Sequence, residues 1–334
     1  MAVKHSFYRL PQKRYNFVKA PFWIEKVNHD MNPFTGKVKV PYIRFRKANT
    51  LRNDSTQHDW QHWAGYRDQI QQVLEQTLEH NHCGRGHILL LGAGNGNDVP
   101  ISYIESIFER ITIVDIDEQA LDRFLAKSAH PEKYERAIID LTGVGTEVSS
   151  PDDLKAKVDE LLPNVDFSTL NSPFDVVMNL CFTTQLISAF FYRKKNKVTH
   201  TPEFSAQLDR LLERIHINIF QSLRGLLAPE GVIVHLTDTL LLQHIKTTGH
   251  TSPAVFKTLE LTGGNLRENL DLIYGHLPEM AKQGLCLPGA FVHVHPQIMR
   301  WYKIELRFSL LWEFVHDEYE DRDYFVSAHV LTKL

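Results

Sequence analysis

Three glycines and one aspartate have the spacing of a site that holds a nucleoside. Gly92, Gly94 and Gly96 occupy alternate positions, and Asp115 follows nineteen residues after the last of them. Glycine has no Cβ, so its backbone can turn tightly and approach a bound ligand closely. A carboxylate placed about twenty residues beyond such a loop can accept hydrogen bonds from two ribose hydroxyls. The pattern therefore predicts a site for a nucleoside-bearing cofactor.

The surrounding segments predict the elements that position these residues. Residues 88–91, Ile-Leu-Leu-Leu, are wholly apolar, as in a parallel strand that is buried on both faces. Asn97 or Asp98 is predicted to cap the next helix, with Pro100 in its first turn. A second apolar strand, 111–114, follows and ends at the carboxylate. The predicted unit is strand, glycine loop, helix, strand and acid.

The glycine spacing distinguishes between cofactors. A dinucleotide site has the spacing Gly-x-Gly-x-x-Gly, with a helix N-terminus facing the pyrophosphate. Here the spacing is Gly-x-Gly-x-Gly, which resembles motif I of the class I S-adenosylmethionine-dependent methyltransferases. The resemblance covers residues 88–236. It implies an α/β fold with a Rossmann-like, seven-stranded, mostly parallel sheet, and S-adenosyl-L-methionine as the cofactor.

The resemblance also implies which residues contact the cofactor. Asp115 is expected to hold the ribose. A third strand is predicted over 137–141, and an acid or its neighbour there meets the adenine amino group in the family, which indicates Asp140 and Leu141. The alternative is that Asp140 only caps the next turn. The expected cofactor-binding residues are Gly92, Ala93, Gly94, Asn95, Gly96, Asp98, Asp115, Ile116, Asp140, Leu141 and Asn179.

Two positions bear on an alternative reaction, aminopropyl transfer by a relative of spermidine synthase. Leu90 stands where methyltransferases usually have an acid, and the aminopropyltransferases also lack that acid. The fourth predicted strand, 174–181, ends in Asn179, Leu180 and Cys181, whereas those enzymes carry an aspartate just past it. The missing carboxylate favours methyl transfer. The Asn-Pro-Pro-aromatic signature of N-methyltransferases is also absent.

Methyl transfer is an in-line displacement at a sulfonium, so positioning can supply most of the catalysis. An amine or hydroxyl acceptor must still lose a proton. The fifth predicted strand, 231–236, contains His235 and is followed by Asp238. We expect Asp238 and Asn179 to be catalytic, with Asp238 as the base. The alternative for Asp238 is an N-cap of a following helix.

Two groups of histidines suggest a metal, but each lacks a complete set of ligands. Residues 80–83 are His-Asn-His-Cys, with His87 nearby, and no second pair follows at a zinc-site spacing. His293 and His295 would share one strand face without a third ligand. We expect no metal site.

Composition predicts a cytoplasmic enzyme. The chain has 334 residues, a net charge of −3 and three scattered cysteines, too few for a disulfide framework. It has no apolar run near the roughly 18 residues of a membrane span and no secretory h-region at its start. Length allows one large domain or two small ones. The expected partner is a small-molecule acceptor and not a membrane.

Residues 1–55 differ from the rest of the chain in charge. The first fifty hold eleven Lys or Arg, interleaved with aromatic residues, against Glu25 and Asp30. Such an arm is either a nucleic-acid footprint, as in an RNA methyltransferase, or a surface extension that packs on the acidic main body. Prolines up to Pro41 predict irregular or short-stranded structure. The predicted domains are a basic, aromatic-containing N-terminal extension (1–55) and a methyltransferase-like domain (56–334).

The remaining segments complete the predicted domain. Trp60, Trp63 and Tyr66 begin a helical pattern and are either residues of a lid over the cofactor or plain core. A long helix is predicted from Pro202, and an insertion over 239–300 is expected to shape the substrate pocket. The C-terminal segments predict an antiparallel hairpin, with strands over 302–315 and 323–331.

Overall fold

The computed structural model describes residues 42–148, 151–186, 202–290, 292 and 294–334. Residues 39–334 form one compact unit. The basic arm up to residue 41, and His293, lie outside the described residues. Within the described ranges, no helix is both long and apolar enough to cross a membrane.

The centre of this unit is a sheet with the order β3-β2-β1-β4-β5-β8-β7, and the two-residue β6 pairs with β5. The strands are β1 (His87–Leu91), β2 (Arg110–Asp115), β3 (Tyr134–Ile138), β4 (Phe174–Leu180), β5 (Leu227–Ile245), β6 (His250–Thr251), β7 (Tyr302–His316) and β8 (Glu320–Lys333). β1 to β5 run parallel, and β8 is antiparallel to both β5 and β7. The predicted α/β fold class and the C-terminal hairpin are confirmed.

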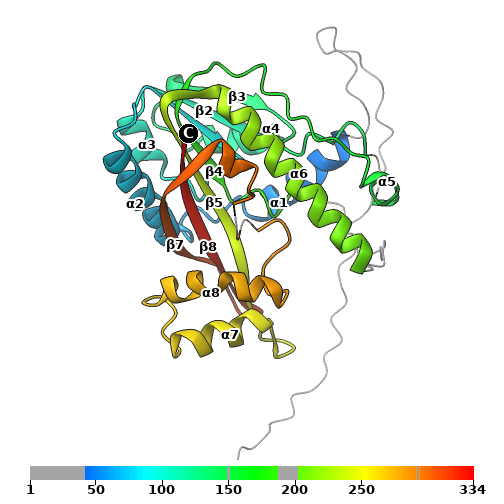
Figure 1. Ribbon diagram of the computed structural model, residues 1–334. Coiled ribbons are helices and arrows are strands. Elements are labelled where there is room, and N and C mark those ends of the chain that lie inside the picture. Colours follow the sequence, from blue (N-terminus) through cyan, green and yellow to red (C-terminus); the bar gives the residue numbers. More distant parts are fainter. Residues whose placement is uncertain (1–41, 149–150, 187–201, 291, 293) are drawn as a thin grey trace, which may run out of the picture. The chain divides into compact units, whose positions relative to one another are not determined.

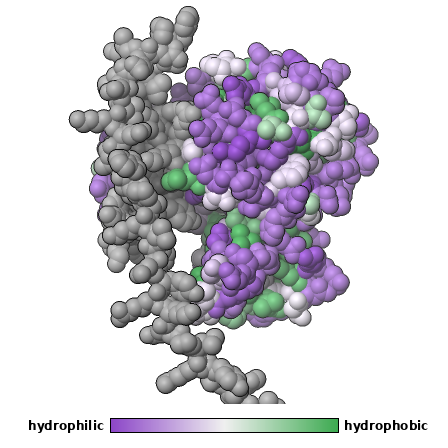
Figure 2. All heavy atoms as spheres, turned by 180° about the vertical axis from the view of Figure 1, so that it is seen from behind, coloured by the Kyte–Doolittle hydropathy of each residue, from purple (hydrophilic) through white to green (hydrophobic). Residues whose placement is uncertain are grey.

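Helices cover both faces of the sheet (Figure 1). They are α1 (Tyr42–Ser55), α2 (Ala64–Asn81), α3 (Ile101–Ile107), α4 (Glu118–Leu125), α5 (Pro151–Lys157), α6 (Pro202–Leu226), α7 (Pro253–Thr262) and α8 (Leu270–Lys282). α2, α3 and α4 pack on one face, and α5 and α6 pack on the other. The side seen in Figure 2 is mostly hydrophilic, with hydrophobic atoms in small groups, as expected when most apolar side chains are used inside.

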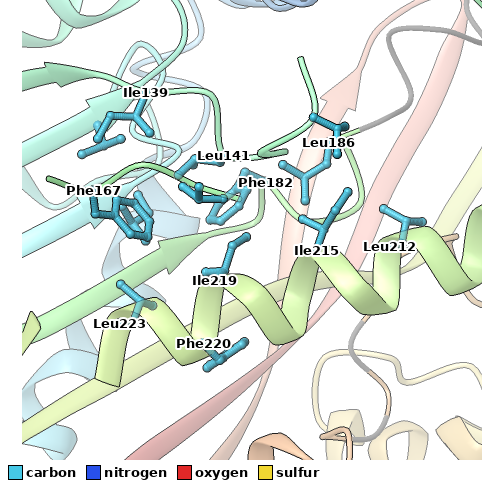
Figure 3. Packing of buried hydrophobic residues seen from close by; sticks show 14 of the residues in the cluster. Ile139, Leu141, Phe167, Phe182, Leu186, Leu212, Ile215, Ile219, Phe220 and Leu223 are labelled. Carbon is cyan, nitrogen blue, oxygen red and sulfur yellow. The ribbon is translucent and has the colours of Figure 1, made fainter. Parts of the chain in front are cut away.

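The apolar pattern of β1 explains the two layers. Successive side chains of a strand point to opposite faces, so Leu89 and Leu91 pack under α6 while Ile88 and Leu90 pack under α2. α6 presents residues four apart, including Ile215 and Ile219, to the sheet, as an amphipathic helix does. Figure 3 shows these α6 side chains packed towards the strands. The predicted helix from Pro202 is confirmed.

Three strands extend beyond the carboxyl edge of the parallel sheet. The fifth strand was predicted for 231–236, but β5 continues to Ile245 because it pairs with β8 from Val232 to Ile245. The extension carries α7 and α8 (Figure 1) around a separate apolar cluster that includes Leu240 and Phe325. The predicted insertion, 239–300, therefore begins as a continuation of the sheet.

Two other predicted boundaries were wrong. The expectation of irregular structure up to residue 55 fails for Tyr42–Ser55, which is α1; no proline follows Pro41 to interrupt it. The third strand was predicted for 137–141, but β3 spans Tyr134–Ile138. β3 is at the edge of the sheet, so it contains the half-buried Glu135 and the exposed Arg136 and does not resemble the apolar inner strands.

Candidate functional site

The glycine loop is tied to the end of β2 by backbone hydrogen bonds. The amides of Gly92 and Ala93 donate to the carbonyl of Val114 at 2.9 and 3.0 Å. The amide of Gly94 donates to Asp115 Oδ2 at 2.9 Å, and that of Asp117 donates to Asp115 Oδ1 at 2.9 Å. Burial raises the pKa of Asp115 to about 6, while these amide hydrogen bonds act in the opposite direction. The carboxyl of Asp115 therefore lies directly against the loop.

The three glycines do not serve the same purpose. All have positive φ, but a Cβ on Gly92 would lie 2.7 Å from Phe182, and one on Gly96 would overlap the ring of Phe124. These two positions require glycine because protein side chains pack against them. A Cβ on Gly94 would meet Asn53 Oδ1 at 3.2 Å. Packing within the protein thus accounts for glycine at Gly92 and Gly96, and the expected close approach of a ligand stays a prediction.

We expect Gly96→Ala to lower the free energy of unfolding by about 2–5 kcal/mol. Positive φ costs an L residue about 1–2 kcal/mol, and overlap with Phe124 costs about 1–3 kcal/mol. Urea denaturation measures the loss. Gly249→Ala is the matched control, because Gly249 has φ +70 and open space around it, so only the first cost applies. Equal losses in the two variants would contradict the packing role.

The asparagines of the loop bind protein groups. Asn95 Oδ1 accepts from Arg123 Nε at 2.7 Å, and the Asn95 carbonyl accepts from Lys127 Nζ at 2.7 Å. Asn97 Nδ2 donates to the carbonyl of Thr56. The predicted cap of α3 by Asn97 or Asp98 is therefore wrong, since Pro100 is the N-cap and no side chain caps that helix.

Asp98 adds a second partly buried carboxyl beside the loop. Burial raises the pKa of Asp98 to about 7, although the positive charges of Arg67 and Lys127 act in the opposite direction. The Arg67 guanidinium lies 3.8 Å from the ring centroid of Trp60 and donates to the Asn97 carbonyl at 2.7 Å. The end of the sheet that carries the glycine loop thus holds two carboxyls, Asp98 and Asp115, whose proton affinity is higher than in water.

Asp140 makes the contacts of a turn. Its Oδ1 accepts from the Thr142 amide at 2.9 Å and from Thr142 Oγ1 at 2.7 Å, and its Oδ2 accepts from the Gly145 amide at 2.8 Å. These bonds correspond to the alternative in which Asp140 stabilises the following turn. Leu141 and Ile116 are buried in the apolar cluster under α6, where Figure 3 labels Leu141 beside Phe182.

Asn179 and His235 lie side by side on β4 and β5. They are register partners, and Asn179 Nδ2 donates to His235 Nδ1 at 2.9 Å. Both side chains are fully buried. Burial lowers the pKa of His235 well below its ordinary value, so the imidazole is neutral. Among the described residues, Asn179 Oδ1 has no hydrogen-bond partner.

Asp238 lies inside β5 and faces the end of β4. Its Oδ1 accepts from Thr184 Oγ1 at 2.6 Å, and the side chain is 5% exposed. Burial raises the pKa of Asp238 to about 7, although the Thr184 hydrogen bond and the charge of Arg52 act in the opposite direction. The N-cap alternative is wrong, because β5 continues past Asp238 as a strand to Ile245.

No model of a known protein family matches the chain, and no curated protein matches it. Several solved structures do. A SAM-dependent methyltransferase from Anabaena variabilis is 12% identical, with a TM-score of 0.42, 92% of this chain covered and 100% of that one. The N-methyltransferase NodS from Bradyrhizobium japonicum, in complex with S-adenosyl-L-homocysteine, is 12% identical, with a TM-score of 0.40, 87% of this chain covered and 98% of that one. An rRNA methylase from Streptococcus thermophilus is 11% identical, with a TM-score of 0.30, 78% of this chain covered and 95% of that one. At these identities the likeness concerns the fold.

The aromatic residues before β1 belong to the core. Trp63 and Tyr66 are 5% and 3% exposed, and Tyr66 stacks on Trp312 with ring centroids 4.7 Å apart. This packing agrees with the core alternative and not with a mobile lid. The hydroxyl of Tyr66 nevertheless reaches the sheet edge, 3.4 Å from Cys181 Sγ. Burial raises the pKa of that thiol well above its usual range, so Cys181 is not a reactive nucleophile.

Two of the candidate histidines, His87 and His295, contact protein groups. His87 Nε2 lies 2.8 Å from Thr112 Oγ1, and His295 Nε2 lies 3.1 Å from Glu213 Oε1. Among the residues that the structure describes, no group of three or more His, Cys, Asp or Glu is arranged to hold a metal ion. Cys83, Cys181 and Cys286 are all free thiols.

Two residues that border the site, Arg52 and Asn53, were not predicted from the sequence. They lie in the last turn of α1, a helix that sequence reasoning did not predict. The available signal was a polar run, Arg52 to Ser55, directly before the aromatic segment that begins at Trp60. Such a run is typical of a solvated turn and gives no indication of its tertiary partner.

Proposed function

We propose that the protein transfers a methyl group from S-adenosyl-L-methionine to the nitrogen or oxygen of a small or medium-sized acceptor. The observation that carries the proposal is the hydrogen bond from the Gly94 amide to Asp115 Oδ2. In a dinucleotide site the amides of the loop and the following helix face a phosphate. Here that amide is engaged by a carboxylate at the end of β2.

The carboxyls at this edge of the sheet support a cofactor that offers hydrogen-bond donors. Asp98 lies in the loop and Asp115 lies directly against it, while the nearby cations Arg123 and Lys127 are already engaged by Asn95. S-adenosylmethionine offers such donors, namely an ammonium, two ribose hydroxyls and an adenine amino group. Carboxylates are suited to accept from such groups. The donor and acceptor chemistry of these residues fits this cofactor.

We assign the cofactor contacts on this basis. Asp115 holds the ribose hydroxyls, and Gly94 gives the ligand room against the backbone. Asp98 takes the methionine ammonium, a role for which Leu90 offers no carboxylate. Ile116 and Leu141 supply apolar surface for the adenine. The bound cofactor supplies a methyl group activated by the positive charge on sulfur.

The acceptor side is assigned to the ends of β4 and β5. Asp238, whose raised pKa of about 7 suits proton exchange near neutrality, accepts the proton that an amine or hydroxyl must lose. Asn179 offers a buried amide oxygen as a hydrogen-bond acceptor. Residues 239–300, which include α7 and α8 beyond the same edge, form the wall of the acceptor pocket.

Two alternatives remain to be separated by experiment. The basic residues of the extension 1–55 favour RNA as the acceptor, although most of that segment lies outside the described residues. Aminopropyl transfer would require a base past β4, where Asn179, Leu180 and Cys181 stand. Within the described part of that edge, the nearest such carboxyl is on β5, so we favour methyl transfer.

Calorimetric titration with S-adenosylhomocysteine tests the cofactor, with NAD as a negative control. Tritium from methyl-labelled S-adenosylmethionine should then appear in a pool of small amines, phenols and alcohols. Transfer to RNA alone, with an affinity that falls steeply with salt, would select the RNA alternative. Binding of NAD without S-adenosylhomocysteine would overturn the proposal.

Asp115→Ala should weaken S-adenosylhomocysteine binding by about 2 kcal/mol, roughly thirtyfold, the scale of hydrogen bonds to a charged group. The variant removes the ribose acceptor and frees the Gly94 amide. Asp122→Ala, an exposed aspartate on the outer side of α4, is the control and should bind normally. Unchanged affinity in folded Asp115→Ala would contradict the ribose assignment.

A further inference from the structure

The last turn of α1 docks on the cofactor loop. Asn53 Nδ2 donates to Asp117 Oδ2 at 3.0 Å, and the Asn53 carbonyl accepts from Asn95 Nδ2 at 2.6 Å. Asp54 pairs with Arg123 at 3.1 Å. These three contacts join α1 to the loop, to the residue that caps α4 and to α4 itself.

The neighbouring residue of the same turn reaches the acceptor side. Arg52 Nη1 donates to Gln185 Oε1 at 3.0 Å, and Gln185 Nε2 donates to the Cys181 carbonyl at 3.3 Å. Thr184, adjacent to Gln185, donates to Asp238. Arg52 and Asn53 are consecutive, so one turn of helix contacts both halves of the site.

The groups that face Asp238 are of different kinds. Tyr66 of α2 and Cys181 after β4 carry hydroxyl and thiol groups that interact with the carboxylate, and burial keeps both protonated. On the paired strand, β8, its partner is the apolar Val326. Arg52 of α1 is a cation whose charge lowers the pKa of Asp238, after the larger effects of burial and of the Thr184 hydrogen bond. Together with the Arg52–Gln185 hydrogen bond, this places the guanidinium on the acceptor side of the site.

We propose that Arg52 is a positioning residue for the proposed reaction: Asn53 and Asp54 dock the last turn of α1 on the cofactor loop, and this docking holds the Arg52 guanidinium beside Asp238. The proposal rests on the proposed function, in which Asp238 accepts the proton of the acceptor. Its consequence is a coupling between the two halves of the site. A change in the cofactor loop alters the ionisation of the base through α1.

The coupling can be measured without knowing the acceptor. Carbon-detected NMR of the full chain labelled on aspartate carboxyls follows the titration of Asp238, whose signal is identified by its loss in Asp238→Asn. Arg52→Gln should raise the titration midpoint by about 0.5–1 pH unit, because a favourable charge is removed. Arg52→Lys keeps the charge and should restore most of the original midpoint.

Asn53→Ala separates docking from simple proximity. It removes the hydrogen bond to Asp117, one of the three docking contacts, while the chain keeps its arginine, so the midpoint of Asp238 should rise, though by less than in Arg52→Gln. Ser55→Ala is the matched control, because the exposed Ser55 hydroxyl only donates to the Arg52 carbonyl of its own helix, and its midpoint should not move. An unchanged midpoint in folded Arg52→Gln, or in folded Asn53→Ala, would overturn the proposal.

Titration with S-adenosylhomocysteine keeps this result separate from the proposed function. If the wild-type chain fails to bind it, the proposed function fails, whereas the midpoints still decide whether Arg52 acts on Asp238. If it binds, the midpoint of Asp238 in Asn53→Ala should move back towards that of the wild type as the loop is filled. No movement on binding would overturn the coupling.

Discussion

Gly94→Val should abolish measurable binding of S-adenosylhomocysteine, a loss of at least about a hundredfold, while the protein remains folded. Gly94 has φ +48, which a β-branched residue adopts only with strain of about 1–3 kcal/mol. A Cβ there would already lie 3.2 Å from Asn53 Oδ1, and the valine methyls would fill the remaining space against the loop. Calorimetry measures the affinity, and circular dichroism establishes the fold.

The control for this variant must carry the same backbone strain elsewhere. Gly284 has φ +71 at the end of α8, with open space around it, so Gly284→Val should lose stability and keep its affinity. A second variant, Gly94→Ala, adds only the Cβ and should weaken binding less than valine does. Normal affinity in folded Gly94→Val would show that the ligand binds elsewhere.

The part of the site that the sequence predicted is local in the chain. β1, the glycine loop and β2 are encoded by two apolar runs and a glycine pattern within thirty residues, and their structure matches the prediction. The position of Asp115 followed from the same pattern. Such elements are predictable because a parallel inner strand must be apolar on both faces.

Other features depend on partners that are distant in the chain. Nothing around Asp238 signals that the strand continues, and only the pairing of β5 with β8 establishes it. Likewise, the purpose of Gly92 is set by Phe182, ninety residues later. The docking of α1 through Asn53 depends on Asp117 and Asn95, so a polar turn resembles a solvated one until its tertiary contacts are known.

Asp238→Asn should lower turnover about a hundredfold or more while leaving the affinity for S-adenosylhomocysteine nearly unchanged. A positioned general base contributes about 10²–10⁴-fold, and asparagine keeps the oxygen that accepts from Thr184 but cannot take a proton. In the wild type, turnover should rise with pH through about 7, where the carboxyl ionises. Tritium transfer to the acceptor found in the pool measures both effects. Normal turnover in the variant would exclude Asp238 as the base.

The same substitution has a pH-dependent effect on stability that needs no acceptor. The ordinary pKa of an aspartate is 3.8, and that of folded Asp238 is raised to about 7, so the folded state binds more protons than the unfolded state between these values. Its contribution to the free energy of unfolding therefore falls as pH rises from about 4 to about 7. Asparagine does not ionise, so Asp238→Asn does not lose stability in this way as pH rises.

The stability of Asp238→Asn relative to wild type should thus grow by about 2–3 kcal/mol between pH 5 and pH 8, as measured by urea denaturation. Asp159→Asn is the control. Hydrogen bonds from Gln207 and Arg210 lower the pKa of the exposed Asp159, so its carboxyl is ionised at both pH values and its effect should not change between them. If the difference in the free energy of unfolding between Asp238→Asn and wild type is the same at both pH values, the Asp238 carboxyl is already ionised at pH 5. A base that is ionised at such a low pH could not produce a rise in turnover near pH 7.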